Sequence, residues 1–181
     1  MRILRARALV EDDWALEGEP GTGGLAPGAR VIVPLERWRA ERDSLASRFA
    51  AVGVLVPNTA DIEAVHPEIA DRPLIALEFP RFADGRALSQ AVVLRKRLRF
   101  EGELRAVGDV IRDLVYWLGR CGFDAIVPRA DQDLQACRLA LDELTVVYQD
   151  AADGRVPVWR QRRSAAAQRM PAGAAGAREA P

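Results

Sequence analysis

The sequence predicts an α/β protein with a mainly parallel, open sheet of five to six short strands covered by helices. From Val31 onward, short apolar runs alternate with amphipathic stretches of about 10–15 residues, the rhythm of βαβ units. Most of these runs are followed by Pro, Asn or Asp, residue types that begin helices. Because consecutive parallel strands are joined by right-handed crossovers, this alternation favours a parallel sheet. A length of 181 residues fits one such domain.

The composition divides the chain into three parts. Residues 1–30 form an irregular N-terminal segment that ends in GEPGTGGLAPG, a glycine run without the spacing of a phosphate-binding loop. Residues 31–150 form the single α/β domain. Residues 151–181 form an extension and a disordered tail, because SAAAQRMPAGAAGAREAP offers almost nothing to bury.

Each element of the domain has a local signal. Pro34 is well placed as the first residue of a helix, and Asn58 supplies an oxygen that can cap the next one. Gly122 is a natural residue to end a helix. In chain order we expect strand 31–33, helix 34–50, strand 52–56, helix 58–65, strand 74–79, helix 86–98 capped by Asp84, strand 104–107, a helix capped by Asp109 and ending before Gly122, strand 125–127, a helix capped by Asp131, and strand 145–148.

Charge excludes some partners. The formal net charge is zero, while residues 81–129 carry ten basic and six acidic side chains. This local excess is too small and too interleaved with acids for duplex nucleic acid, and it suits a small anion or an acidic protein partner. Neither a membrane-spanning apolar run nor a signal peptide is visible, so we expect no membrane partner and a cytoplasmic protein.

Few metal-ligating or cofactor-binding residues are present. With only His66, Cys121 and Cys137, a four-ligand zinc site needs carboxylates and a four-thiolate iron–sulfur cluster cannot form, so we expect no metal. Both cysteines fall on apolar helix stripes, which favours buried thiols over the alternative of a redox role for Cys121. No glycine fingerprint supports a nicotinamide nucleotide or a flavin, and we expect no cofactor bound by the chain itself.

The candidate site lies where two expected strands pass into helices, because ligands of parallel sheets collect at the carboxyl ends of strands. Its residues are Asp84, Arg86 and Ser89 at one junction, and Arg105, Asp109, Arg112 and Asp113 at the next.

Each of these side chains has a structural alternative. Asp84 and Asp109 are either helix caps or catalytic acids or bases. Arg105, inside a short strand, must be paired or must point at a ligand. Arg112, in the first turn of a helix, either helps to bind an anion or pairs with Asp109 or Asp113.

The run FPRFADGRALSQAVVLRKRLRFEGELRAVGDVIRDLVYWLGRCGFDA resembles the signature block of a bacterial family of unknown function. Its members are commonly described as probable oxidoreductases involved in sulfite reduction and tend to be encoded beside the sulfite reductase hemoprotein. The motifs are DGR followed by Ser89, GELRAVGD, and RCGFDA. This chain departs at Leu88, where an aromatic residue is expected, and at Leu114, where a glutamine is expected.

The resemblance implies a pathway, and two hypotheses follow. In the first, the chain is an accessory protein of assimilatory sulfite reduction that docks on sulfite reductase or on its electron donor, with segment 81–129 as the contact surface. In the second, it is an oxidoreductase that binds a small oxyanion through Arg86, Ser89, Arg105 and Arg112, with Asp84 or Asp109 as acid or base. The second hypothesis needs a borrowed cofactor, because these side chains carry no electrons.

Overall fold

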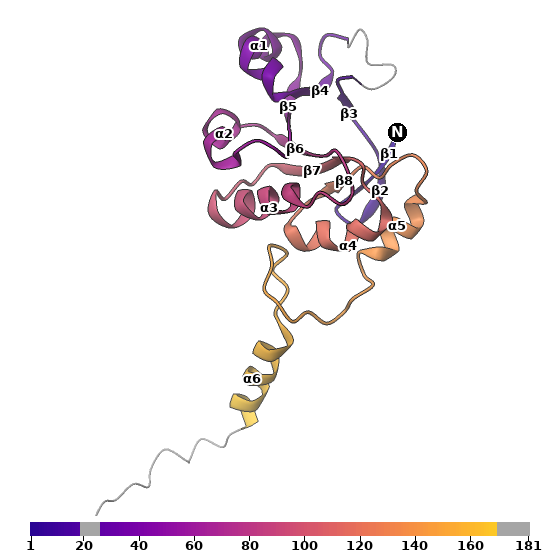
Figure 1. Ribbon diagram of the computed structural model, residues 1–181, viewed down its shortest axis with the longest axis vertical. Helices are drawn as coiled ribbons and strands as arrows, with labels where there is room; N and C mark the ends of the chain where they lie inside the picture. Colours follow the sequence, from indigo (N-terminus) through magenta and orange to yellow (C-terminus); the bar gives the residue numbers. More distant parts are fainter. Residues whose placement is uncertain (19–25, 170–181) are drawn as a thin grey trace, which may run out of the picture.

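The computed structural model describes residues 1–18 and 26–169. It confirms an α/β protein with a mostly parallel sheet (Figure 1). Within these residues the sheet has eight strands, more than the five or six expected, in the order β2-β1-β8-β7-β6-β5-β4-β3. The strands are β1 (Arg2–Arg5), β2 (Ala8–Glu11), β3 (Trp14–Leu16), β4 (Arg30–Pro34), β5 (Ala51–Val56), β6 (Leu74–Phe79), β7 (Glu103–Gly108) and β8 (Ala125–Ile126).

The helices follow the expected alternation. They are α1 (Leu35–Arg48), α2 (Ile62–Ile69), α3 (Arg86–Val92) continued by the π-helical turn η1 (Val93–Arg97), α4 (Arg112–Cys121), α5 (Leu134–Ala140) and α6 (Val158–Arg169). None of the helices in the two described ranges is long and apolar enough to cross a membrane.

The N-terminal segment is the main difference from the expected fold. Three of the eight strands lie within residues 1–30, which were expected to be irregular. β1 pairs antiparallel with β2 on one side and with β8 on the other, whereas β3 pairs parallel with β4. These strands were missed because each has only three or four residues, too few for a pattern of alternation to stand out.

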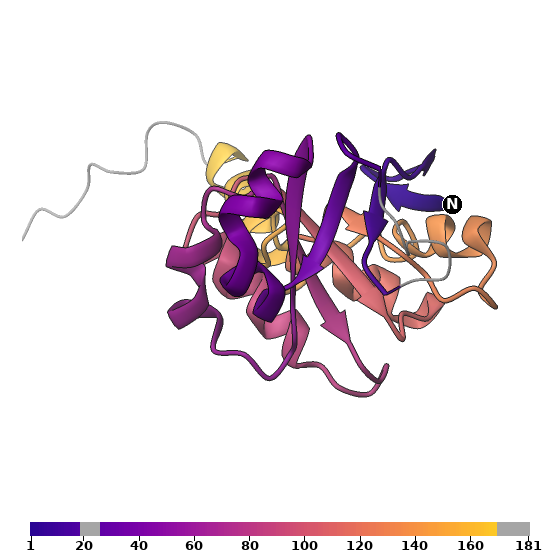
Figure 2. The ribbon, with the colours of Figure 1, turned by 90° about the horizontal axis from the view of Figure 1, so that it is seen from above.

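The two edges of the sheet are joined by Asp12 and Asp13, the only residues between β2 and β3. Three residue steps span at most about 11 Å, whereas seven inter-strand spacings in a flat sheet would span about 34 Å. The sheet therefore cannot be flat. It curls so that β2 and β3, which run in the same direction, act as one bent strand that borders both edges (Figure 2).

The curl gives the sheet an outer and an inner face. Because β4 to β8 are sequential neighbours, crossovers of one hand place all their helices on the same side. The main core lies on this outer face, where Val54, Ile75 and Leu104 of the sheet share a cluster with Trp38 of α1 and Leu118 of α4.

The inner face packs against itself. A second cluster there contains Trp14, Ile32, Leu74, Ala76 and Val107, all buried, and no helix residue belongs to it. The strands are thus covered by helices on one face and by the curled sheet itself on the other.

A buried ion network joins the inner face to the bent strand. The Arg105 guanidinium, 1% exposed, lies 2.8 Å from Asp12 Oδ2 and 2.7 Å from Glu103 Oε1. Arg5 bridges the same carboxylates, with Nε 3.1 Å from Glu103 Oε2 and Nη2 3.4 Å from Asp12 Oδ1. Asp12 also accepts a hydrogen bond from the Trp14 backbone N–H at 3.2 Å, so the network fixes the start of β3.

Several local expectations are corrected. The cap of α2 is Asp61, which accepts the Glu63 N–H at 3.0 Å, whereas Asn58 is buried after β5. The cap of α5 is Asp133, two residues beyond Asp131. Gly122 does end α4 in a left-handed conformation, with φ of 94°.

The C-terminal part also differs from expectation. Residues 145–148 are not a strand of the sheet. α6 extends to Arg169, so residues 164–169, which were expected to be disordered, are helical. The rest of the expected disordered tail, residues 170–181, lies outside the described residues.

The substitution Arg105→Ala should lower the free energy of unfolding by about 3 kcal/mol, because it removes a buried guanidinium and leaves Arg5 alone to compensate the carboxylates of Asp12 and Glu103. Urea unfolding followed by circular dichroism measures this change. Arg97→Ala is the control, since its pair with Glu63 is exposed and should contribute at most about 1 kcal/mol. Equal effects of the two substitutions would contradict the structural role of Arg105.

Candidate functional site

Loops at the carboxyl ends of β6, β7 and β8 form the rim on which most of the sequence-predicted residues lie. Gly108 ends β7 with φ of 98°, and a Cβ there would lie 2.4 Å from the Phe79 carbonyl oxygen. Glycine is therefore required where the ends of β6 and β7 approach each other. The next residue, Asp109, is placed directly beside the β6–α3 loop.

Asp109 connects three loops. Its Oδ2 accepts the Phe82 backbone N–H at 2.9 Å, and its Oδ1 lies 2.6 Å from Arg129 Nη1. Arg129 in turn forms two hydrogen bonds with Asp131, at 2.7 and 2.8 Å. Sequence reasoning missed Arg129, although its position in the loop that follows β8, two residues before Asp131, was a usable signal. Asp109 is thus an inter-loop bridge and not the cap of α4, whose first backbone N–H, that of Arg112, donates to Gln132 Oε1 at 2.9 Å.

Asp84 and Arg86 form a separate pair at the start of α3. Arg86 Nη2 lies 2.6 Å from Asp84 Oδ2, and the Arg86 backbone N–H also donates to Asp84 at 3.2 Å. These two bonds hold the pKa of Asp84 far below its usual value, with a further contribution from buried Asn58. A carboxylate with so low a pKa is a weak general base and remains ionised at neutral pH.

The other predicted residues point elsewhere. Arg112 Nη2 lies 3.1 Å from Glu143, which raises the pKa of Arg112, and Arg112 also contacts Asp113 at 3.4 Å. Ser89 is exposed on α3. Arg105 is buried on the inner face within the ion network. The predicted ligand-binding residues are therefore not brought together in one site.

The remaining chemistry of the body is limited. Burial raises the pKa of both the Cys121 and the Cys137 thiol, so both resist forming a reactive thiolate. Among the described residues, no group of three or more His, Cys, Asp or Glu side chains could hold a metal ion. Among the predicted rim residues, the guanidiniums of Arg86 and Arg112 are paired with carboxylates, as is that of Arg129.

A second surface, which sequence reasoning did not identify, lies between α5 and α6. We call it the C-terminal strip; its members are the exposed side chains of Leu144, Val146, Tyr148, Val156 and Trp159. Val146 is 66% exposed and Tyr148 is 74% exposed. The two segments of the strip are held together by hydrogen bonds from Val158 N to the Val147 carbonyl at 2.8 Å and from Trp159 Nε1 to the Tyr148 carbonyl at 3.1 Å.

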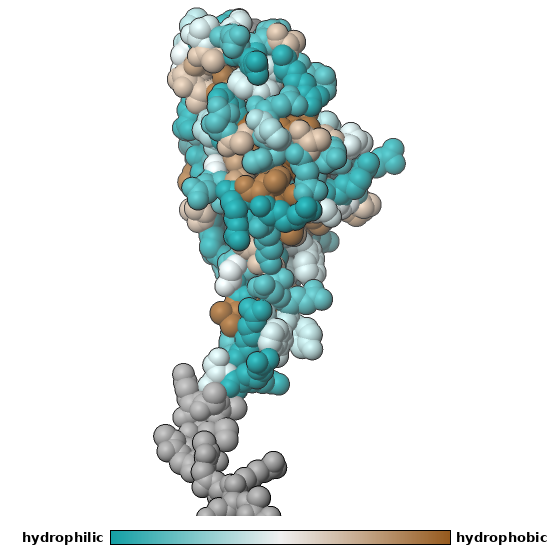
Figure 3. Space-filling model, turned by 90° about the vertical axis from the view of Figure 1, so that its left-hand side faces the viewer, coloured by the Kyte–Doolittle hydropathy of each residue, from teal (hydrophilic) through white to brown (hydrophobic). Residues whose placement is uncertain are grey.

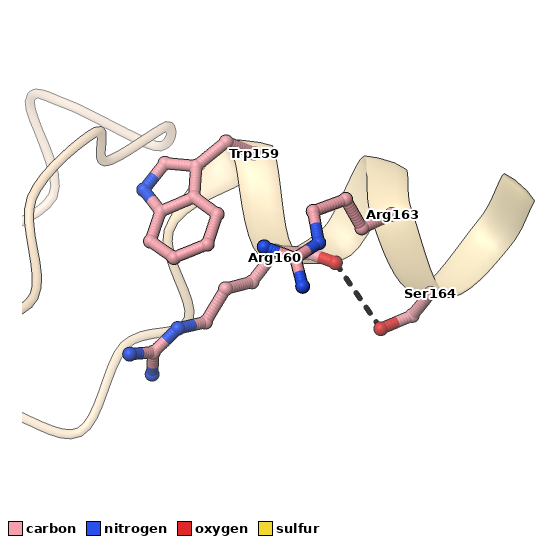
Figure 4. A pocket seen from close by; sticks show the side chains of 4 residues that line it. All are labelled: Trp159, Arg160, Arg163 and Ser164. Atoms are coloured by element: carbon pink, nitrogen blue, oxygen red, sulfur yellow. Dashed lines mark hydrogen bonds between the residues drawn. The ribbon is translucent and has the colours of Figure 1, made fainter. Parts of the chain in front are cut away.

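An open hollow of about 590 Å³ continues the strip along α6. Trp159, Arg160, Arg163 and Ser164 line it, and the two guanidiniums lie 5.1 and 5.7 Å from the Trp159 ring centroid (Figure 4). Ser164 Oγ donates to the Arg160 carbonyl at 3.1 Å and so turns toward its own helix. An exposed indole flanked by guanidiniums is typical of protein-binding surfaces.

Comparison with known proteins identifies a family and no activity. The family described as "Bacterial protein of unknown function (DUF934)" matches residues 53–159, which include the strand-end rim and the C-terminal strip. No curated protein and no solved structure matches the chain.

The Arg129–Asp131 pair yields a pH prediction. Arg129 lowers the pKa of Asp131 from 3.8 to about 2, so the stabilisation that it provides is complete above pH 3.8 and is lost as the pH falls towards 2. In Arg129→Gln the pKa of the Asp131 carboxyl should rise towards 3.8, with hydrogen bonds from Gln132 and the backbone still lowering it in part, as measured by NMR of its carboxyl carbon. Arg86→Gln should leave this titration unchanged, because Arg86 pairs with Asp84. An Asp131 midpoint that stays near 2 in Arg129→Gln would refute the assigned cause.

Proposed function

We propose that this chain, which belongs to the DUF934 family of bacterial proteins of unknown function, is an accessory protein of assimilatory sulfite reduction. It acts by docking on the sulfite reductase hemoprotein or on its electron donor. The pathway rests on the resemblance of residues 79–125 to proteins encoded beside that hemoprotein. The proposal that it acts by docking rests on the exposed apolar side chains of the C-terminal strip.

The C-terminal strip carries the proposal for docking. Residues 145–148 are apolar enough to suggest a buried strand, yet Val146 and Tyr148 are exposed beside Val156 and Trp159. A contiguous group of exposed large apolar side chains usually marks an interaction site. Isolated exposed apolar residues such as Phe82 need no such explanation.

Segment 81–129, the contact surface expected from its charge, supports docking less well. Its basic side chains are largely neutralised within the molecule, as Arg95 is by Asp124 and Arg120 by Asp153. Lys96 likewise lies 3.5 Å from Asp150. The excess of positive charge that the sequence shows locally is thus balanced in part by carboxylates from outside the segment, such as Asp150 and Asp153.

The alternative, an oxidoreductase that binds a small oxyanion at the rim, receives less support from the geometry. Arg86 and Arg129 already hold carboxylates, which an incoming oxyanion would have to displace. Asp84 is too acidic to serve as an efficient base at neutral pH.

Growth of a strain lacking this chain tests the pathway. We expect failure on sulfate and on sulfite, with normal growth on sulfide or cysteine, because the block would lie at the step that reduces sulfite. Colony growth on each compound as sole sulfur source is the measurement. Equal growth on all four compounds would remove the chain from this pathway.

The double substitution Val146→Ser with Tyr148→Ser tests the docking surface. We expect binding to the reductase or its donor to weaken about tenfold or more, as for residues at the centre of an interface. Both side chains are exposed, so the melting temperature should hardly change. Calorimetric titration measures the affinity.

The control for this surface is Phe82→Ser, which removes an apolar side chain exposed to a similar degree on the β6–α3 loop. It should leave the affinity unchanged. If Phe82→Ser weakens binding as much as the double substitution does, the contact lies at the rim and not at the C-terminal strip.

A further inference from the structure

Helix α6 is set apart from the rest of the molecule by its position. It projects away from the curled sheet (Figure 1), and the hydrogen bonds of Val158 and Trp159 to residues 147 and 148 tie its first turn to the C-terminal strip. Seen from the side, the projecting helix presents a largely hydrophilic surface (Figure 3). A helix that buries so little of itself in its own chain gains little stability from packing there.

Its charge is equally distinct. From Arg155 to Arg169 the sequence has five arginines and no acidic residue. We call residues 155–164 the arginine arm. Within the described part of the chain, the guanidiniums of Arg160, Arg162 and Arg163 pair with no carboxylate, although arginines elsewhere mostly do. The arm is therefore a concentration of positive charge that the chain does not balance locally.

The arm could in principle meet a membrane, a nucleic acid or a protein. An interfacial membrane helix needs a face of large apolar side chains, and after Trp159 the helix continues as RQRRSAAAQR, with no apolar residue larger than alanine. A nucleic-acid surface needs a dense basic face, whereas Asp150 and Asp153 lie just before the arm and the whole chain has no net charge.

The chemistry of the arm fits a protein surface that carries carboxylates. Guanidiniums bind carboxylates with two parallel hydrogen bonds, and Trp, Tyr and Arg dominate the energetic centres of protein interfaces. Here Arg160 and Arg163 flank the indole of Trp159 beside the open hollow, and the Trp159 indole N–H donates to the carbonyl of Tyr148 on the strip. An acidic patch with an apolar side chain at its centre complements this arrangement.

We propose that the arginine arm docks on an acidic surface of the partner protein, with carboxylates on Arg160 and Arg163 and an apolar side chain in the hollow beside Trp159. This inference rests on the proposed function, because it specifies the partner chemistry for the same C-terminal surface. The strip supplies apolar contact, and the arm supplies charge that selects the partner and orients it.

The test compares charge-reversed variants in binding to the purified sulfite reductase hemoprotein and to its electron donor. Arg160→Glu with Arg163→Glu should weaken binding about tenfold or more, because repulsion replaces attraction. Wild-type binding should also weaken between 50 and 200 mM salt. Arg2→Glu with Arg42→Glu is the control, since it changes net charge equally at exposed positions outside both the arm and segment 81–129, and its affinity should stay near that of the wild type.

The outcomes separate the two proposals. If the wild-type chain binds and the arm variant binds equally well, the inference fails while the proposed function stands. If the wild-type chain binds neither the reductase nor its donor, the proposed docking function fails. A decaglutamate peptide then decides the inference by itself: binding that is lost in the arm variant supports the arm as an acidic-protein site, and absence of binding overturns it.

Two further probes distinguish the other classes of partner. Vesicles of phosphatidylglycerol and a 20-base-pair DNA duplex are titrated under the same conditions. Arm-dependent binding to either probe that exceeds binding to decaglutamate would overturn the assignment to a protein partner.

Discussion

The two-residue connection between β2 and β3 is the constraint on which the rest of the structure depends. It joins the edges of an eight-stranded sheet and so forces the curl, which turns one face of β4 to β8 outward to the helices and folds the other inward. Asp12 lies at this bend and holds Arg105 on the inner face, with Arg5 and Glu103 completing the network. Burying such charges is costly, and good geometry offsets the cost. The network also ties the N-terminal strands to β7, which no local sequence signal would specify.

The same geometry explains why the rim does not behave as an anion site. The curl brings the loops after β6, β7 and β8 close enough for Asp109 to contact both Phe82 and Arg129. Where these loops meet, the guanidiniums of Arg86 and Arg129 pair with carboxylates of the same chain, and the Arg129 pairs help to order the loops. Ligand binding at the ends of parallel strands is a general tendency of the architecture. A ligand can bind there only if charged side chains at the rim are free to contact it. Arg86 and Arg129 are instead paired with Asp84 and Asp109.

The type and order of the elements between Val31 and Leu141 could be predicted from the sequence, because their signals are local, although the caps of α2, α4 and α5 were misplaced. β6 was predicted with its observed bounds, and Gly122 ends α4 as expected. The curl could not be predicted, because it depends on the pairing of three very short strands with distant partners. Arg105 shows the limit well: its need for a partner was evident from its place in a strand, but the choice between a ligand and a carboxylate depended on Asp12, 93 positions away. For residues 145–148 the pattern was misleading, since apolar runs also occur where a surface is kept exposed.

The contrast between paired arginines in the body and unpaired arginines in the arm makes the charge distribution of the molecule uneven. In the body, cations and carboxylates mostly neutralise one another, so the long-range field is weak despite 26 basic and 26 acidic residues. The arginine arm departs from this arrangement next to the C-terminal strip. A partner approaching from solution therefore meets positive charge at the same end of the molecule that exposes Tyr148 and Trp159. Charge acts over several ångströms and apolar contact only after water is excluded, so the arm would orient the partner first and the strip would then hold it.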